Sequence, residues 1–192
     1  APAPPASDLQ VTITATADGY SNAAASALVT VPAIVVDVEP QSPDPLLATK
    51  SMQFTVTVTN DPANAGVTWS VVCSATECGN VSPASTLSPG SVTYTAPPLP
   101  SSDLSVSVIA TSVTNPANSS QVTVTVPAIA VSAISPPSGI VPITGMPQFT
   151  ATVNNDPTGQ GLNWTLTENG SDCTPGCGTM NPLSTASPGT SA

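Results

Sequence analysis

Residues 53–70 read QFTVTVTNDPANAGVTWS, and this stretch decides the fold. Apolar residues alternate with threonine from Phe54 to Val58, which is the two-residue period of a half-buried β-strand. Turn-forming residues follow over 60–66, and the alternation resumes around Trp69. The stretch therefore predicts two antiparallel strands joined by a turn, with Phe54 and Trp69 in a core.

The same features recur 95 residues later in the chain. This shift places Asn60-Asp61-Pro62 on Asn155-Asp156-Pro157 and Trp69 on Trp164. Beyond the tryptophans the register slips, because Trp69 precedes Cys73 by four residues and Trp164 precedes Cys173 by nine. Other segments match at the same shift: Val31-Pro32-Ala33-Ile34 with Val126-Pro127-Ala128-Ile129, Gln53-Phe54-Thr55 with Gln148-Phe149-Thr150, Asp8-Leu9 with Asp103-Leu104, and Ala15-Thr16 with Ala110-Thr111. We interpret the chain as a tandem repeat with a longer loop in its second copy.

The repeat divides the chain into one whole module and two partial ones. Residues 32–126 form a complete repeat, residues 1–31 correspond to the last third of a preceding repeat, and residues 127–192 to the first two thirds of a following one. From these boundaries we expect the chain to be a window on a longer tandem array, or the repeating unit of a fibre.

The spacing of apolar runs and turns predicts an all-β fold. Six or seven short strands within 95 residues, separated by proline- and asparagine-containing turns, are typical of an antiparallel β-sandwich of immunoglobulin-like type. A parallel sheet would need helical crossovers, and the sequence offers none. The expected large core residues are Trp69, Trp164, Phe54, Phe149 and Tyr94.

Composition restricts function more strongly than length does. The 192 residues include eleven acids, one base (Lys50) and no histidine. Without histidine the chain has no Ser-His or Cys-His nucleophile and no imidazole metal ligand, so we expect no enzyme, no catalytic residues, no metal and no cofactor. A net charge of −10 disfavours binding to nucleic acid or anionic lipid. No apolar run is long enough to span a membrane.

The four cysteines form two close pairs, Cys73 with Cys78 and Cys173 with Cys177. Disulfide pairing within each repeat is the simplest interpretation, and it indicates an oxidising compartment outside the cytoplasm. A zinc site would need both pairs at one ion, although they lie in separate modules. A redox motif is disfavoured because no basic neighbour lowers the thiol pKa values.

With these motifs placed, the repeat resembles bacterial immunoglobulin-like domains found in tandem in large exported and surface proteins. The resemblance covers essentially the whole chain and is carried by the segments 53–58, 60–70, 78–79, 92–97 and 108–112. It implies extracellular display, adhesion or structural spacing without catalytic residues. The pattern departs from antibody domains, whose disulfide joins the two sheets, because here each cysteine pair closes one loop.

Other polar residues admit ordinary structural interpretations. Asp37, Glu39 and Asp44 follow one module junction and could chelate calcium, but the next junction offers no matching carboxylates. Asp61 and Asp156 suit turns, where short polar side chains bond to the local backbone. The sequons at Asn80, Asn118, Asn163 and Asn169 permit glycans without indicating them, because sequons arise by chance in a Ser/Thr-rich chain.

Two functions follow as hypotheses. The first is a non-catalytic structural repeat of an extracellular stalk, fibre or filament, whose partners are neighbouring copies or repeats of the same protein. Copies could join by strand completion, because residues 127–192 lack a strand like Val92 to Thr95 and residues 1–31 supply the strands that follow it. The alternative is an adhesin or carbohydrate-binding module, for which the six aromatic residues are few.

Overall fold

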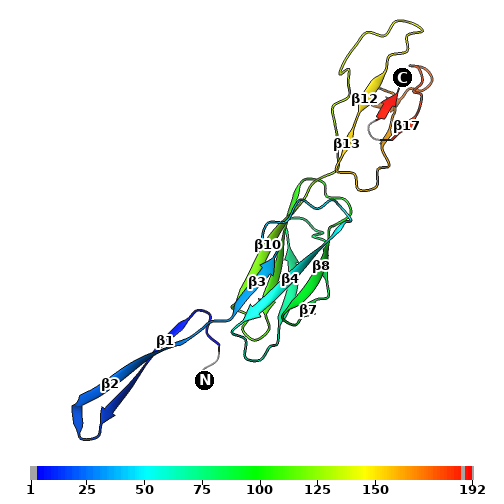
Figure 1. The fold of residues 1–192 in the computed structure, drawn as a ribbon. Helices are drawn as coiled ribbons and strands as arrows, with labels where there is room; N and C mark the ends of the chain where they lie inside the picture. Colours follow the sequence, from blue (N-terminus) through cyan, green and yellow to red (C-terminus); the bar gives the residue numbers. More distant parts are fainter. Residues whose placement is uncertain (1–3, 187–188, 192) are drawn as a thin grey trace. The chain divides into compact units, whose positions relative to one another are not determined.

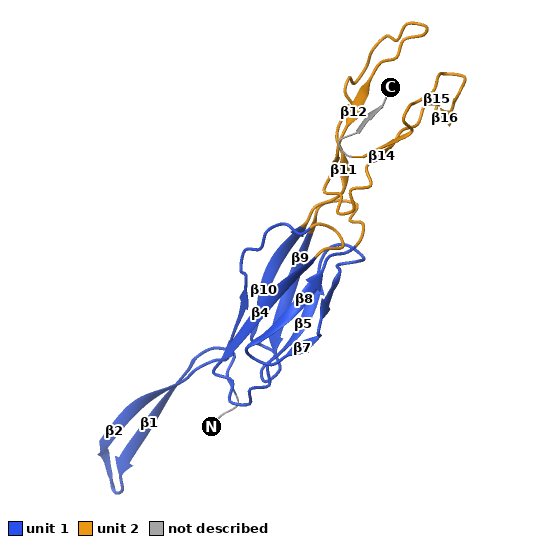
Figure 2. Ribbon diagram, turned by 45° about the vertical axis from the view of Figure 1, so that its right-hand side comes forward, with its two compact units in different colours: residues 1–46, 51–97, 105–125 blue, residues 47–50, 98–104, 126–192 orange. Residues whose placement is uncertain are grey.

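The computed structural model describes residues 4–186 and 189–191, and within them the regular secondary structure is entirely β. The strands divide between two compact units (Figure 2). Unit 1 falls within residues 1–46, 51–97 and 105–125, and unit 2 within residues 47–50, 98–104 and 126–192. The described part of the chain contains no helix long and apolar enough to cross a membrane.

Two four-stranded antiparallel sheets form the central sandwich (Figure 1). One sheet has the order β3-β4-β8-β6, and the other has the order β10-β9-β5-β7. The first is built from Val35–Glu39 (β3), Ser51–Thr59 (β4), Asn80–Ser82 (β6) and Gly90–Thr95 (β8). The second is built from Val67–Val72 (β5), Ser85–Thr86 (β7), Leu104–Ser112 (β9) and Ser119–Val126 (β10). The predicted all-β class with antiparallel sheets is confirmed.

The alternating pattern of the sequence determines which side chains enter the core. In β4 the side chains of Phe54 and Val56 are buried, while Thr55 between them and Thr57 after them face solvent. Antiparallel pairing places Phe54 opposite Val92 of β8, so that both inward rows share one face of the sheet. Each fully buried valine or phenylalanine contributes about 1.5–3 kcal/mol relative to an exposed one.

Tyr94 reaches from this core to the first disulfide loop. Its side chain is fully buried, and its hydroxyl donates a 2.8 Å hydrogen bond to the carbonyl oxygen of Cys78. Burial raises the pKa of Tyr94 to about 12, since the phenolate would lose its hydration. The phenol therefore remains a hydrogen-bond donor that anchors the loop.

Ahead of the sandwich the chain forms a long two-stranded hairpin (Figure 1). Leu9–Ala17 (β1) pairs antiparallel with Tyr20–Val31 (β2), beginning at Leu9 opposite Val31, with an irregularity between Thr16 and Ala17. By the 95-residue shift, this hairpin corresponds to β9 and β10 of the sandwich.

Unit 2 contains short strands in small antiparallel pairs. Ala130–Val131 (β11) pairs with Val153–Asn154 (β13), and Leu162–Asn163 (β14) pairs with Ser184–Thr185 (β17). The other two pairs are Phe149–Ala151 (β12) with Gly189–Ser191 (β18), and Thr167–Glu168 (β15) with Ser171–Asp172 (β16). The last pair forms in the predicted insertion, which is thus a small hairpin rather than an irregular loop.

The two units share the same strand register. Leu162 lies opposite Thr185 as Val67 lies opposite Thr86. The indole Nε1 of Trp164 donates to Thr185 Oγ1 at 3.0 Å, and that of Trp69 donates to Thr86 Oγ1 at 2.9 Å. Both tryptophans are buried, whereas Phe149 is only partly buried. Residues separated by the repeat length therefore make matching contacts even where unit 2 is less enclosed.

Candidate functional site

Three residues hold the connection between the hairpin and the sandwich. Asp8 Oδ1 accepts a 2.9 Å hydrogen bond from the backbone N–H of Ala33. Asn60 Nδ2 donates a 2.8 Å hydrogen bond to the carbonyl oxygen of the same residue. We call Asp8, Ala33 and Asn60 the junction cluster. The cluster links the residue before β1 and the residue after β4 to the segment that leads into β3. In that segment Ala33 follows Pro32, whose ring fixes its own φ angle.

An equivalent cluster occurs 95 residues later. Asp103 Oδ1 accepts a 2.9 Å hydrogen bond from the N–H of Ala128, and Asn155 Nδ2 donates a 2.8 Å hydrogen bond to the Ala128 carbonyl. Asn60 and Asn155 both have φ near 60°, a left-handed conformation that asparagine tolerates better than most residues. The recurring Asn-Asp-Pro motif thus forms a turn and also supplies an asparagine that bonds to the alanine of a Val-Pro-Ala segment.

The aspartates of this motif stabilise the turn itself. Asp61 accepts hydrogen bonds from the N–H groups of Ala63 and Ala65 and a 2.7 Å bond from the hydroxyl of Thr114. Burial alone would raise the pKa of Asp61, but these hydrogen bonds to the carboxylate outweigh burial and lower it. In unit 2 the hydroxyl and N–H of Thr158 lower the pKa of Asp156 to about 2.

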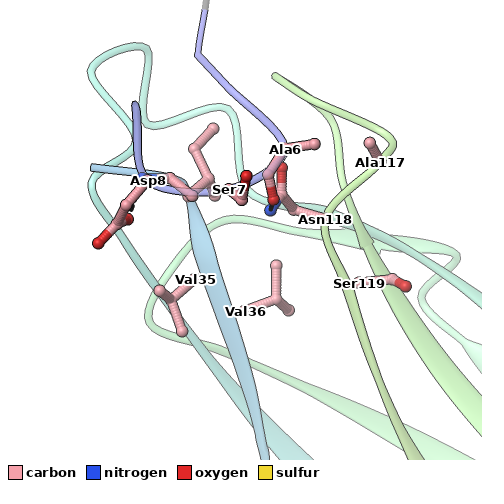
Figure 3. A pocket seen from close by; sticks show the side chains of 10 residues that line it. Ala6, Ser7, Asp8, Val35, Val36, Ala117, Asn118 and Ser119 are labelled. Carbon is pink, nitrogen blue, oxygen red and sulfur yellow. Dashed lines mark hydrogen bonds between the residues drawn. The ribbon is translucent and has the colours of Figure 1, made fainter. Parts of the chain in front are cut away.

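A shallow pocket lies beside the junction cluster (Figure 3). Asn118 Nδ2 donates a 3.1 Å hydrogen bond to the Ala6 carbonyl, and Asn115 Nδ2 donates a 2.9 Å bond to the Pro4 carbonyl. These bonds tie the chain before β1 to the loop between β9 and β10. The pocket is open and lined mostly by small apolar or hydroxyl side chains, with Asp8 Oδ1 and Asn118 Nδ2 bonded to the backbone and Asn118 Oδ1 buried without a hydrogen-bond partner among the described residues. It lacks the enclosed, convergent polar groups of a small-molecule site.

Both cysteine pairs form disulfides within their own repeat. Cys73 bonds to Cys78, and Cys173 bonds to Cys177. Both bridges close loops outside the sheets, and no cysteine within the described part of the chain is free. Since such bonds persist in oxidising compartments, they indicate an environment of the extracellular or secreted type.

The remaining candidate residues lie apart from one another. In the described residues, no three histidine, cysteine, aspartate or glutamate side chains form a group that could hold a metal. Asp37 and Glu39 instead accept hydrogen bonds from Gln41. Of the sequon asparagines, Asn118 is part-buried and bonded to Ala6, whereas the other three are exposed: Asn80, Asn163 and Asn169.

One sheet face of the β1–β2 hairpin is apolar and uncovered. Register places opposite one another the pairs Leu9 and Val31, Val11 and Val29, and Ile13 and Ala27; we call these six residues the hairpin face. Ile13 is 58% exposed, whereas Val108, its counterpart in the complete repeat, is fully buried. The hairpin therefore displays a row of side chains of the kind that the sandwich buries.

Unit 2 has an uncovered apolar region of its own. A hollow is lined by Val131, Ile134, Ala151, Leu162, Asn163 and Trp164, and we call it the unit 2 hollow. Val131 is exposed there although its counterpart Val36 is buried. Ile143 is 95% exposed, and its counterpart Ala48 is fully buried. Val131 and Ile143 are thus exposed at positions where the complete repeat buries its side chains.

Comparison with protein-family models and with curated proteins found no match to this chain. The geometry of the described residues therefore carries the functional interpretation. The sequence alone identifies Asp8, Asn60 and their counterparts as repeat matches or turn residues. Their shared contact with the alanine of the Val-Pro-Ala segment is seen only in the structure. The signal was present in the sequence, because Asp, Val-Pro-Ala and Asn all recur at one shift.

Proposed function

We propose that the protein is a non-catalytic structural repeat of an extracellular stalk, fibre or filament, built from immunoglobulin-like domains that join end to end. The observation that carries the proposal is the recurrence of the junction cluster, with the same two hydrogen bonds at Ala33 and at Ala128. A contact that recurs at each Val-Pro-Ala segment is expected where modules of one type follow one another in a regular array.

The strand order supports the immunoglobulin-like part of the proposal. The orders β3-β4-β8-β6 and β10-β9-β5 follow the A-B-E-D and G-F-C orders of an immunoglobulin-like sandwich, with β7 added beside β5. The matching registers of unit 2 support a second module of the same type. The disulfides are consistent with display outside the cytoplasm.

The test is to image the purified chain and to measure its mass in solution. Elongated particles that lengthen with protein concentration, seen by negative-stain electron microscopy and light scattering, are the expected result. Compact particles that stay at the mass of one chain at every concentration would contradict end-to-end assembly.

The adhesin or carbohydrate-binding alternative rests on one residue. Tyr20, at the start of β2, is the one strongly exposed aromatic side chain among the residues that the structure describes, at 74%. Carbohydrate sites usually stack sugars on aromatic rings, and a single ring is a small platform. Binding to a glycan array that is lost in Tyr20→Ala would favour this alternative over the structural role.

A further inference from the structure

We propose that the β1–β2 hairpin of one copy completes unit 2 of a second copy, with the hairpin face covering the unit 2 hollow. This inference rests on the proposed function and specifies the end-to-end contact that it requires. Four observations carry it: a free strand edge, a transferable register, the exposed apolar side chains, and the exposed counterparts of a backbone hydrogen bond of the sandwich.

The free strand edge belongs to β14. In the sandwich, its counterpart β5 lies between β7 and β9 and is paired on both sides. In the described part of unit 2, β14 pairs with β17 alone. The side of β14 that corresponds to the β9 position therefore has backbone groups available for a further strand, which is how strand addition gains its affinity.

The 95-residue repeat predicts the register of this added strand. In the sandwich Thr68 lies opposite Thr111 and Trp69 lies opposite Ala110. Moving the β5 residues forward by 95 positions and the β9 residues back by 95 positions gives the predicted pairs. These are Asn163 opposite Thr16 and Trp164 opposite Ala15. Ala15 is identical to Ala110, so the same small side chain would meet the indole in both places.

The exposed apolar side chains of the hairpin face occupy positions that the complete repeat buries. The hairpin face corresponds to Leu104, Val106, Val108, Val122, Val124 and Val126, all of which are buried in the complete repeat. In unit 2 the exposed Val131 corresponds to buried Val36. Bringing the two surfaces together would remove both from water, at about 25 cal/mol for each Å² of apolar area.

The second hairpin strand also has a place to bind. In the sandwich the N–H of Leu46 donates a 2.9 Å hydrogen bond to the carbonyl of Thr125 in β10. The counterparts of these residues are Val141 and Thr30, both exposed. Placing β2 in the β10 position would let Val141 donate to Thr30 and would shield the neighbouring Ile143.

A second copy is the occupant that this chain specifies. Two segments carry the required pattern, the β1–β2 hairpin and the β9–β10 pair, and the sandwich already buries the inward face of the latter. The hairpin face and the unit 2 hollow are different surfaces, so the contact is heterologous. A heterologous contact repeats from copy to copy, and it yields an open chain when the rotation between successive copies does not close a ring.

Cysteine cross-linking tests the predicted register. The double variant Thr16→Cys with Asn163→Cys should form a ladder of disulfide-linked oligomers when the full chain is oxidised with copper phenanthroline. Directly opposed residues lie about 5.5 Å apart at their Cα atoms, within the range of a disulfide. The native cysteines are all bonded, so the new pair supplies the free thiols.

Two control variants make this experiment decisive. Thr12→Cys with Asn163→Cys moves the thiol four residues along β1, about 13 Å, and should give a much weaker ladder. The single variant Thr16→Cys should remain monomeric on a non-reducing gel. A strong dimer in the single variant would show hairpins facing one another, and a cross-linked monomer in the double variant would show closure within one chain. Either result would overturn the proposal.

A charged side chain introduced into the hairpin face distinguishes hairpin insertion from the broader proposal of end-to-end assembly. Ile13→Asp should weaken association on the order of 100-fold, because assembly would bury an unpaired carboxylate. Thr12→Asp, on the opposite face, should leave association nearly unchanged. Filaments that persist in Ile13→Asp would overturn hairpin insertion while leaving end-to-end assembly standing. A wild-type chain that never associates would contradict both hairpin insertion and end-to-end assembly.

Discussion

Asn60 shows how one side chain can combine a backbone conformation with a contact. Its φ of 60° places it in the left-handed region, and its amide bonds to the Ala33 carbonyl. Asn60→Gly should cost about 1 kcal/mol of unfolding free energy, since it loses the hydrogen bond and keeps the conformation. Asn60→Ala should cost about 1–2 kcal/mol more, because alanine adds backbone strain. Urea denaturation of both variants measures the difference, and equal stabilities would contradict the role assigned to φ.

Asp156 gives a pH dependence with a defined sign. Its pKa is lowered from 3.8 to about 2 by the hydroxyl and N–H of Thr158. A carboxylate with a depressed native pKa stabilises the fold above the unfolded value, near pH 4, and loses that contribution as the pH falls through about 2. Thr158→Ala removes the hydroxyl and should raise the pKa part of the way. Carboxyl NMR titration checks this, and an unchanged pKa would show that the hydroxyl has no part in the shift.

At the scale of elements, the disulfide loops are separate from the sheets that they follow. Replacing Cys73 and Cys78 together by serine should cost about 2 kcal/mol, the chain-entropy value for a six-residue ring. The sandwich should stay folded, because its sheets are built from strands outside the loop. Denaturation with and without reductant, followed by tryptophan fluorescence, measures the change. Loss of the fold on reduction alone would show that the loop does more than constrain the chain.

The elements that the sequence could predict are those with a strict alternation. Phe54 to Val58 and Val67 to Val71 read as strands because inward valines alternate with outward hydroxyls, and both are strands in the sandwich. Phe149 lies in a strand with a similar pattern but is only partly buried. Its environment depends on which strands cover unit 2, and the local pattern contains no information on that.

The candidate site was less predictable than the strands. Repeat matching located Asp8, Asn60 and Ala33, but only the folded chain shows that they meet at one backbone position. The exposure of the hairpin face was equally hidden, because Ile13 and Val108 have similar sequence neighbourhoods and opposite burial. Local pattern determines which way a side chain points, whereas burial depends on what packs against it.

For the whole molecule, net charge determines how assembly responds to salt. Every copy carries a net charge of −10, so approaching copies repel one another. The surfaces proposed to meet are apolar, and their attraction does not depend on opposite charges. Raising ionic strength from 0.01 M to 0.15 M shortens the screening length from about 30 Å to about 8 Å and should strengthen association. Sedimentation velocity at fixed protein concentration should therefore show larger species at the higher salt, with Ile13→Asp remaining smaller in both buffers. Weaker association at the higher salt would instead point to attraction between opposite charges, for which a chain with one basic residue is poorly equipped.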